Sequence, residues 1–197
     1  MSKRATTEYP IHDLLAERWS PRAFADRKIE PAKLHSLFEA ARWAASCFGE
    51  QPWRFIVASQ DDAEGFEKLA SCLMPGNAWA KKAPVLALSV AAHNFSQNGK
   101  PNRFAFHDVG LAVGNLCAQA QSMGIHLHQM GGFEADKAVQ VLGIPEGYGP
   151  GAMIALGYLG DPATLAEDLQ KRETGPRQRK PQAELVFGAK WGEAAKF

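Results

Sequence analysis

The sequence predicts one domain in which helices cover a sheet, of the mixed α/β or α+β class. Four short apolar stretches of strand-forming residues alternate with stretches whose apolar residues recur at helical spacing. The chain has 197 residues, of which 46% are hydrophobic, and this suits a single domain with a substantial core. No internal repeat or low-complexity segment in the sequence indicates another architecture.

The first part of the chain is predicted to form two helices and a strand. Residues 11–19, IHDLLAERW, carry apolar side chains at helical spacing. A charged connector follows. A second helix then runs from about Pro31 to Ala45, because proline suits a first helical turn and Leu34, Leu37, Phe38 and Ala41 share one face. The stretch WRFIVAS, residues 53–59, is predicted to be a strand.

The middle of the chain continues the alternation of helices and strands. Residues 61–73 are predicted to form a helix capped by Asp61 or Asp62, and residues 77–82 a loop. The run PVLALSVAA, residues 84–92, is a strand expected to be buried on both faces. A polar loop, HNFSQNGKPN, leads into a long helix over residues 106–124 that Gly124 ends.

The remaining elements are shorter. IHLHQM (125–130) is predicted to be a strand, 134–143 a helix, GAMIALGYL (151–159) a strand and 162–173 a helix. The tail then contains several basic residues and a strand-like ELVF at 184–187. This apolar end either folds back onto its own core or reaches a partner subunit.

Charge and cysteine usage narrow the classes of function. The net charge of +1 gives no electrostatic reason to expect nucleic acid or an acidic membrane as a partner. The start, MSKRATTEYP, lacks the apolar core of a signal peptide, and the run APVLALSVAA is far shorter than the ~20 residues that span a bilayer. Three scattered cysteines without a CxxC indicate reduced thiols. We therefore expect a cytoplasmic protein.

Several familiar catalytic patterns are missing from the sequence. GxGxxG after a strand, GxxxxGK[ST] and GxSxG do not occur. His126 and His128 lie two apart on a predicted strand and share a face, but no third ligand is evident nearby, so packing is favoured over a metal site. Cys47 has no His or Asp placed by sequence to activate it and lies near a helix C-terminus, which disfavours a thiolate nucleophile.

Two other features favour ligand binding. Arg18, Ser20 and Arg22 alternate in RWSPR, and Arg177 and Arg179 form a second pair, as a phosphate clamp would need; a solvated charge run is the alternative for each. The junction AASCFGEQPW, residues 44–53, is longer and richer in small residues than a plain helix-to-strand connection. Such a backbone surface suits a flat ligand.

Taken together and in this order, five stretches resemble the nitroreductase family of FMN-dependent oxidoreductases. They are RWSPRAF, LFEAARWAASCFGEQPWRFIVA, HDVGLAVGNLCAQAQSMGI, MGGFEADKAVQVLGIPEGYGPGAMIALGY and RQRKPQAELVF. The resemblance implies an α+β fold with a nitroreductase-like mixed, largely antiparallel sheet flanked by helices. It also implies that residues 1–197 form one FMN-binding domain, of which 174–197 is a tail swapped onto the partner of a homodimer.

The resemblance assigns flavin contacts to four regions. The phosphate and ribityl chain would meet the two basic clamps, with Trp19 between the first pair. The ring would meet the junction loop across the dimer interface, Asn77 at its pyrimidine edge with Lys81 ranked below it, and a glycine turn near N5 and O4. Many members have Asn where this chain has Gly49, which instead permits a positive φ or leaves room for water. The residues implicated are Arg18, Trp19, Ser20, Arg22, Ala45, Ser46, Cys47, Gly49, Gln51, Asn77, Lys81, Gln129, Met130, Gly131, Gly132, Arg177 and Arg179.

The implied activity is ping-pong hydride transfer through flavin N5, from NADH or NADPH to a nitroaromatic, quinone or small conjugated carbonyl. The flavin carries the chemistry, so no side chain is assigned as catalytic and no metal is expected. The loop HNFSQNGKPNRF and the region around Trp79 are candidates to line the open face of the ring. Two alternatives remain open at this point: a flavin storage or sensor protein without reductase activity, and an interaction module with a vestigial site.

Overall fold

A single antiparallel sheet forms the centre of the molecule. In the computed structural model, which describes residues 3–197, four strands lie in the order β1-β2-β4-β3. They are β1 (Trp53–Ser59), β2 (Val85–Ala92), β3 (His126–Met130) and β4 (Tyr148–Gly157). Every neighbouring pair is antiparallel, so the expected α+β class is confirmed and the sheet is not mixed.

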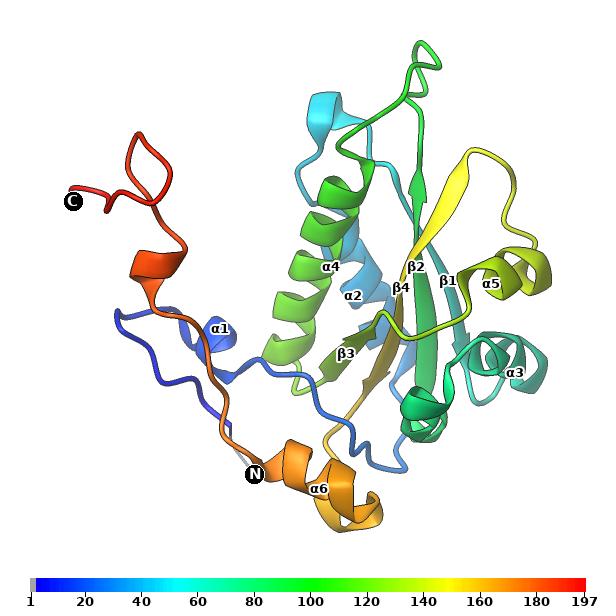
Figure 1. The fold of residues 1–197 in the computed structure, drawn as a ribbon. Coiled ribbons are helices and arrows are strands. Elements are labelled where there is room, and N and C mark those ends of the chain that lie inside the picture. Colours follow the sequence, from blue (N-terminus) through cyan, green and yellow to red (C-terminus); the bar gives the residue numbers. More distant parts are fainter. Residues whose placement is uncertain (1–2) are drawn as a thin grey trace.

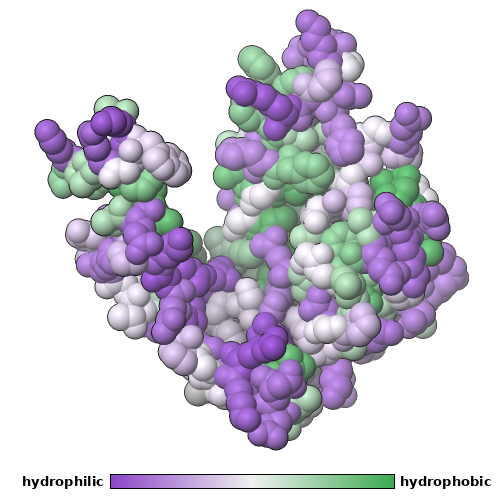
Figure 2. Space-filling model, in the orientation of Figure 1, coloured by the Kyte–Doolittle hydropathy of each residue, from purple (hydrophilic) through white to green (hydrophobic). Residues whose placement is uncertain are grey.

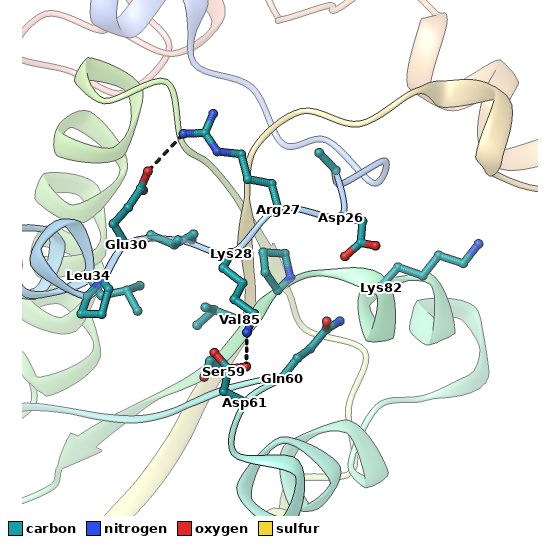
Figure 3. A pocket seen from close by; sticks show the side chains of 14 residues that line it. Asp26, Arg27, Lys28, Glu30, Leu34, Ser59, Gln60, Asp61, Lys82 and Val85 are labelled. Atoms are coloured by element: carbon teal, nitrogen blue, oxygen red, sulfur yellow. Dashed lines mark hydrogen bonds and ion pairs between the residues drawn. The ribbon is translucent and has the colours of Figure 1, made fainter.

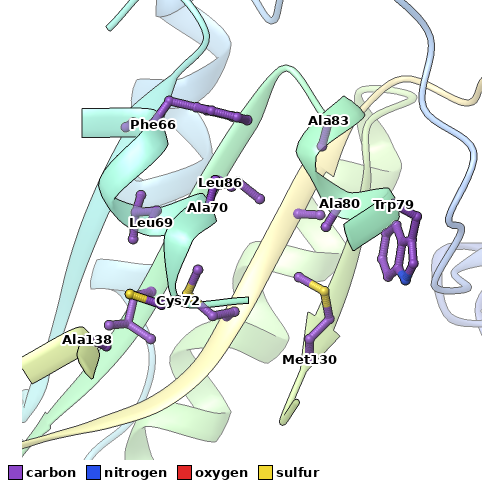
Figure 4. Packing of buried hydrophobic residues seen from close by; sticks show 14 of the residues in the cluster. Phe66, Leu69, Ala70, Cys72, Trp79, Ala80, Ala83, Leu86, Met130 and Ala138 are labelled. Atoms are coloured by element: carbon purple, nitrogen blue, oxygen red, sulfur yellow. The ribbon is translucent and has the colours of Figure 1, made fainter. Parts of the chain in front are cut away.

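Helices cover both faces of this sheet (Figure 1). On one face α2 (Pro31–Arg42) and α4 (Ala105–Ser122) pack in a cluster with Val85, Ala87 and Ile154. On the other face lie α3 (Ala63–Ser71), α5 (Ala135–Leu142) and the 3₁₀ helix η2 (Pro75–Lys82), in a cluster with Leu86 and Met153 (Figure 4). Because successive β2 side chains serve opposite faces, this strand is buried on both, as its continuous apolar sequence predicted.

The two chain ends form an arm beside this core. The N-terminal segment with α1 (Asp13–Glu17) and the chain after α6 (Glu167–Thr174) lie together, away from the sheet (Figure 1). The Gln182 amide donates to the Glu8 carboxylate at 3.1 Å, which ties the two ends to each other. We call residues 3–18 with 175–197 the arm.

Three sequence-based expectations differ from the structure. Residues 77–82 are not a loop but lie in η2. The helix predicted over 162–173 is instead a 3₁₀ turn (Pro162–Thr164) followed by α6. The helical conformation is interrupted at Leu165, which is buried. The stretch ELVF is not a strand: η4 (Gln182–Glu184) covers its start, and Phe187 forms only an isolated bridge with Ala194.

Helix ends follow the expected chemistry closely. The Asp62 side chain accepts from the Gly65 amide at 3.0 Å and so caps α3. Gly124 follows α4 with a φ of +68°. The second helix ends at Arg42, three residues before the expected Ala45, so the junction loop begins earlier. Over residues 3–197, no helix is both long enough and apolar enough to cross a bilayer.

Candidate functional site

The basic residues of the two chain ends converge on one cavity. Its volume is about 280 Å³. The four arginines singled out in the sequence all line it. They come from both ends of the chain: Arg177 donates to the carbonyl of Ala16, which lies 161 residues earlier. Its lining consists of Lys3, Arg18, Trp19, Ser20, Arg22, Arg172, Pro176, Arg177, Gln178 and Arg179. We call its six basic side chains the cation cluster.

Short hydrogen bonds hold this cluster in place. Arg18 Nη1 donates to Ser20 Oγ at 3.3 Å, which aligns the alternating residues of RWSPR. Arg177 Nη1 donates to the carbonyl oxygens of Lys3 and Ala16 at 2.7 and 2.9 Å. Arg177 therefore fastens the tail to the N-terminal segment as well as lining the cavity.

One buried carboxylate lies behind the cluster. Glu173 is 1% exposed. Its Oε1 accepts from the main-chain amides of Arg22 and Ala23 at 2.9 and 3.1 Å, and Oε2 lies 3.0 Å from the same Arg22 amide. Arg22 Nη1 is 3.9 Å from Oε2. The carboxylate thus orders the turn that carries Arg22.

The electrostatics of the cavity favour an anion. Burial, then the nearby Arg18 and Arg179, lower the pKa of Arg177. Burial also lowers the pKa of Lys3, and Arg177 and Arg22 lower it further while Glu173 opposes them. The six cations of the cluster repel one another, and the single buried carboxylate does not neutralise them. An anion would reduce this repulsion, and guanidinium groups match the oxygens of a phosphate or carboxylate.

A glycine turn follows β3. Asn77 Nδ2 donates to the carbonyl of Gly132 at 2.9 Å, and the Met74 amide donates to the same oxygen at 3.2 Å. A Cβ placed on Gly132 would lie 2.7 Å from Asn77 Nδ2, whereas a Cβ on Gly131 would meet nothing within 4 Å. The Asn77 side chain therefore braces the turn, and the main chain at Gly131 is open to an approaching molecule. Met130 is buried and Gln129 exposed, as befits neighbours on a strand.

Two aromatic rings connect the cation cluster to this turn. The Arg22 guanidinium lies 5.9 Å from the Trp79 ring, and the Trp79 and His128 rings are 4.6 Å apart. His128 Nδ1 is 2.9 Å from the Pro21 carbonyl oxygen. Trp79 also stacks on Phe24 and is 8% exposed, so its ring is packed against protein, while the expectation that the region around it lines the open face stays a prediction.

Both strand histidines are packing groups. His126 lies edge-on to Trp19 with ring centroids 6.3 Å apart, and His128 packs on Trp79. Burial lowers the pKa of His128 to about 4. Within residues 3–197, no group of three or more His, Cys, Asp or Glu side chains is arranged to hold a metal ion.

The junction loop has an unusual backbone. Phe48, Gly49 and Gln51 have φ values of +54°, +69° and +52°, so Gly49 uses the positive φ that glycine permits. The Gln51 amide donates to Ser46 Oγ at 3.0 Å. The Cys47 amide donates to Asp108 Oδ2 at 2.9 Å, which makes buried Asp108 the main anchor of the loop.

The loop and the cation cluster lie at opposite ends of α4 in one chain (Figure 1). Asp108 is in the first turn of α4, whereas Cys117 lies further along the helix, where burial raises the pKa of its thiol and the nearby Arg18 partly opposes that shift. Nine residues of α-helix span roughly 14 Å. In one chain, the Ala45–Gln51 loop is thus anchored at the first turn of α4, and the cation cluster lies near a later turn of that helix.

The polar hairpin at 93–102 packs against the junction loop. The Ser96 amide donates to Glu50 Oε1 at 2.8 Å, and the Phe48 and Phe95 rings meet edge-on at 6.1 Å. Phe48 is 85% exposed. The loop and the hairpin thus present one exposed aromatic surface, and any ligand of the loop would also lie near the hairpin.

Lys81 is not brought to either group. It lines a separate cavity with Gln60 and Lys82. Beside that cavity is another of about 340 Å³, in which Lys28 pairs with Asp61 at 2.5 Å and Arg27 with Glu30 at 3.1 Å (Figure 3). Its charges neutralise one another, in contrast to the cation cluster.

Sequence reasoning missed four residues of this arrangement. Asp108 was recognisable only as an acid beside the apolar face of the long helix, and Lys3, Arg172 and Glu173 lie in charged segments without a distinguishing pattern. The roles of Asp108, Glu173 and Lys3 depend on contacts across 61, 151 and 170 residues of sequence.

Comparisons with known proteins show the family of the chain. A family model described as the nitroreductase family matches residues 15–158. A solved oxidoreductase containing FMN is 36% identical, with a TM-score of 0.91 over 100% of this chain and 99% of that chain. An uncharacterized 15.4 kDa protein of Mycolicibacterium smegmatis is 34% identical over 71% of this chain and 97% of its own length. A protein of Archaeoglobus fulgidus, provisionally named an NADH dehydrogenase/NAD(P)H nitroreductase, is 26% identical over 74% of this chain and 83% of its own length.

Proposed function

The chain belongs to the nitroreductase family, and we propose from this membership and from its cation cluster that it is an FMN-dependent NAD(P)H oxidoreductase. The cluster is the observation that carries the proposal. It gathers six basic side chains from both chain ends around one cavity, next to a glycine turn whose main chain is open. A flat molecule with a phosphate at one end needs this combination.

The residues present fit FMN. Arg18, Ser20, Arg22 and Arg179 offer donors to a phosphate, and Arg177 closes the cavity from the tail. Gly131 allows main chain to approach a planar ring, and Asn77 fixes the turn from behind. Bound FMN supplies hydride acceptance from a nicotinamide and hydride donation to an acceptor.

We also propose the order in which the two substrates react and the class of the acceptor. We expect NADH or NADPH and the acceptor to use the same open face in turn, in a ping-pong sequence, because the other face of a ring seated here would pack on protein. We assign no side chain as a general acid, because solvent can supply protons. Nitroaromatics, quinones and small conjugated carbonyls are the acceptor classes that we propose, and the exposed Phe48 ring, which meets Phe95 edge-on, supports planar substrates.

A homodimer would complete the site. The junction loop is anchored at the first turn of α4, away from the cation cluster of its own chain, and we propose that it serves the cluster of a partner. Figure 2 shows a hollow between the arm and the body of the molecule. On α4, Gly110 and Gly114 have nothing within 4 Å of an added Cβ, and Phe106 and Leu111 are exposed. This surface supports close packing of a second copy, with residues 174–197 reaching over it.

A reducing compartment fits the thiols. Cys47, Cys72 and Cys117 are all free, which supports the proposal of a cytoplasmic protein.

An absorbance spectrum of the purified protein, followed by titration with NADH and NADPH under anaerobic conditions, tests the function. We expect a flavin spectrum that bleaches with at least one donor and returns on adding a quinone or nitroaromatic. Parallel lines in double-reciprocal plots would support the ping-pong order. A bound flavin that neither donor bleaches would instead indicate storage or sensing, and a protein that stays colourless after incubation with FMN would contradict the proposal.

A further inference from the structure

We propose that Glu173 is a positioning residue that sets the geometry of the cation cluster through the main chain of Arg22 and Ala23. The identity of the anion rests on the proposed function, since we take it to be the FMN phosphate. Glu173 itself is 1% exposed and is not among the residues that line the cavity.

The hydrogen bonds show what the carboxylate orders. Two consecutive amides, those of Arg22 and Ala23, donate to Glu173 at 2.9 to 3.1 Å. A carboxylate that accepts two neighbouring amides fixes the backbone between them. The Arg22 side chain leaves this fixed turn and enters the cavity, and the Pro21 carbonyl just before it lies on His128.

Glu173 also connects the other parts of the cluster. Lys3 Nζ donates to the main-chain oxygen of Glu173 at 2.6 Å, and Arg177 Nη1 donates to the main-chain oxygen of Lys3 at 2.7 Å. The three cations that approach from the N-terminal segment, the connector and the tail are therefore all fixed relative to one helix end.

Geometry outweighs charge in this role. The side-chain ion pair between Arg22 and Glu173 spans 3.9 Å, at the outer limit of such pairs, whereas the amide contacts have ideal hydrogen-bond lengths. A negative charge behind the arginines also works against an incoming phosphate. If the charge of Glu173 dominates its effect on the cluster, neutralising the side chain should strengthen anion binding. If acceptance of the two amides dominates, shortening the side chain should weaken anion binding.

Two variants separate these roles. Glu173→Gln keeps an oxygen that can accept both amides and removes the charge. Glu173→Asp keeps the charge but withdraws it by about 1.5 Å, one carbon–carbon bond, beyond hydrogen-bond reach. Matched controls are Glu167→Gln and Glu167→Asp, because Glu167 begins the same helix and is exposed.

The measurement is the dissociation constant of each apoprotein for FMN and for riboflavin, which lacks the phosphate, by quenching of flavin fluorescence. We expect Glu173→Asp to lose roughly tenfold or more in the ratio of FMN to riboflavin affinity, the equivalent of one charge-assisted hydrogen bond. Glu173→Gln should stay within about threefold of the wild-type ratio, as should both Glu167 variants. Circular dichroism checks that every variant is folded.

Other outcomes decide against the inference. An unchanged ratio in Glu173→Asp, or an equal loss in both Glu173 variants, would overturn it. If the wild-type protein binds neither flavin, the proposed function fails, and the inference is judged by inorganic phosphate: phosphate should then raise the melting temperature of wild type and Glu173→Gln but not of Glu173→Asp. No stabilisation of the wild type by phosphate would overturn the inference as well.

Discussion

Arg22 and Arg177 line the same cavity but have different structural duties. The Arg22 guanidinium has a single long contact to Glu173, while Arg177 holds the carbonyls of Lys3 and Ala16. We expect Arg22→Ala to weaken FMN binding by about 1.5–3 kcal/mol with little loss of folding stability. Arg177→Ala should lose FMN binding and also lower the melting temperature. Isothermal titration with FMN and thermal unfolding of the apoprotein distinguish the two.

The exposed Lys68 provides the control for these substitutions, since it pairs with Glu64 on α3 and lines no part of the cluster. Lys68→Ala should bind FMN as the wild type does. Wild-type affinity in Arg22→Ala would remove that residue from the site, and a melting temperature unchanged by Arg177→Ala would contradict its fastening role.

The two glycines after β3, Gly131 and Gly132, allow a second matched pair of substitutions. Gly132→Ala places a Cβ against Asn77 Nδ2, so the Asn77 hydrogen bond to the turn must break, at a cost of about 1–3 kcal/mol to the folded protein. Gly131→Ala meets no protein atom within 4 Å, so the apoprotein should unfold as the wild type does while FMN binds more weakly. Denaturant unfolding and FMN titration of both variants test this. Equal FMN affinity in Gly131→Ala would move the ring away from the turn.

Some helices and strands were predictable from the local sequence pattern, whereas others depend on tertiary contacts. The strand at 53–59 and the doubly buried β2 were both predictable from their own apolar residues, and the continuous apolar run of β2 also predicted its burial on both faces. ELVF has equally strand-like residues, yet no strand of its own chain lies beside it to supply the pairing. The break at Leu165 and the burial of Trp79 likewise depend on what packs around them, which single-sequence periodicity does not contain.

The candidate site divides in the same way. The motifs identified four of the six basic residues of the cation cluster, since two separated arginine pairs stand out in the sequence. The supports did not stand out. Asp108 and Glu173 are single acids whose partners lie 61 and 151 residues away, and Lys81, near a motif position, lines another cavity.

The junction loop gives a prediction for the element that it forms with α4. Asp108→Ala leaves the Cys47 amide without its partner, which should destabilise the protein by about 1–3 kcal/mol and free the loop. Asp108→Asn retains an oxygen for that amide and should be milder. If the loop serves a flavin, Asp108→Ala also lowers FMN affinity and turnover with NAD(P)H.

Asp136 is the matched control, because it too is an acid in the first turn of a helix, α5, and is exposed. Asp136→Ala should leave flavin binding and turnover unchanged. Wild-type FMN affinity and turnover in Asp108→Ala would show that the loop has no part in the site.

For the whole molecule, two separate regions of unpaired apolar surface favour assembly. One is on the body, where Trp43, Phe106 and Leu111 are exposed, and the other is on the arm, where Leu15, Leu185 and Trp191 are exposed. Patches of this kind mark interaction sites in soluble proteins. A dimer that brought the arm of one copy onto the body of the other would cover both and would place each junction loop near a foreign cation cluster.

Trp191 tests this assembly without disturbing the single chain, because its side chain is 88% exposed and touches little beyond Phe187. Trp191→Ser should leave the far-ultraviolet circular dichroism unchanged and raise the dimer dissociation constant in analytical ultracentrifugation. FMN affinity should then fall at protein concentrations where the variant is monomeric. Deleting residues 181–197 removes the contact entirely and should give a poorly soluble protein without flavin. A truncated protein that is monomeric yet retains a full complement of FMN would contradict the swapped tail, since each chain would then hold its cofactor alone.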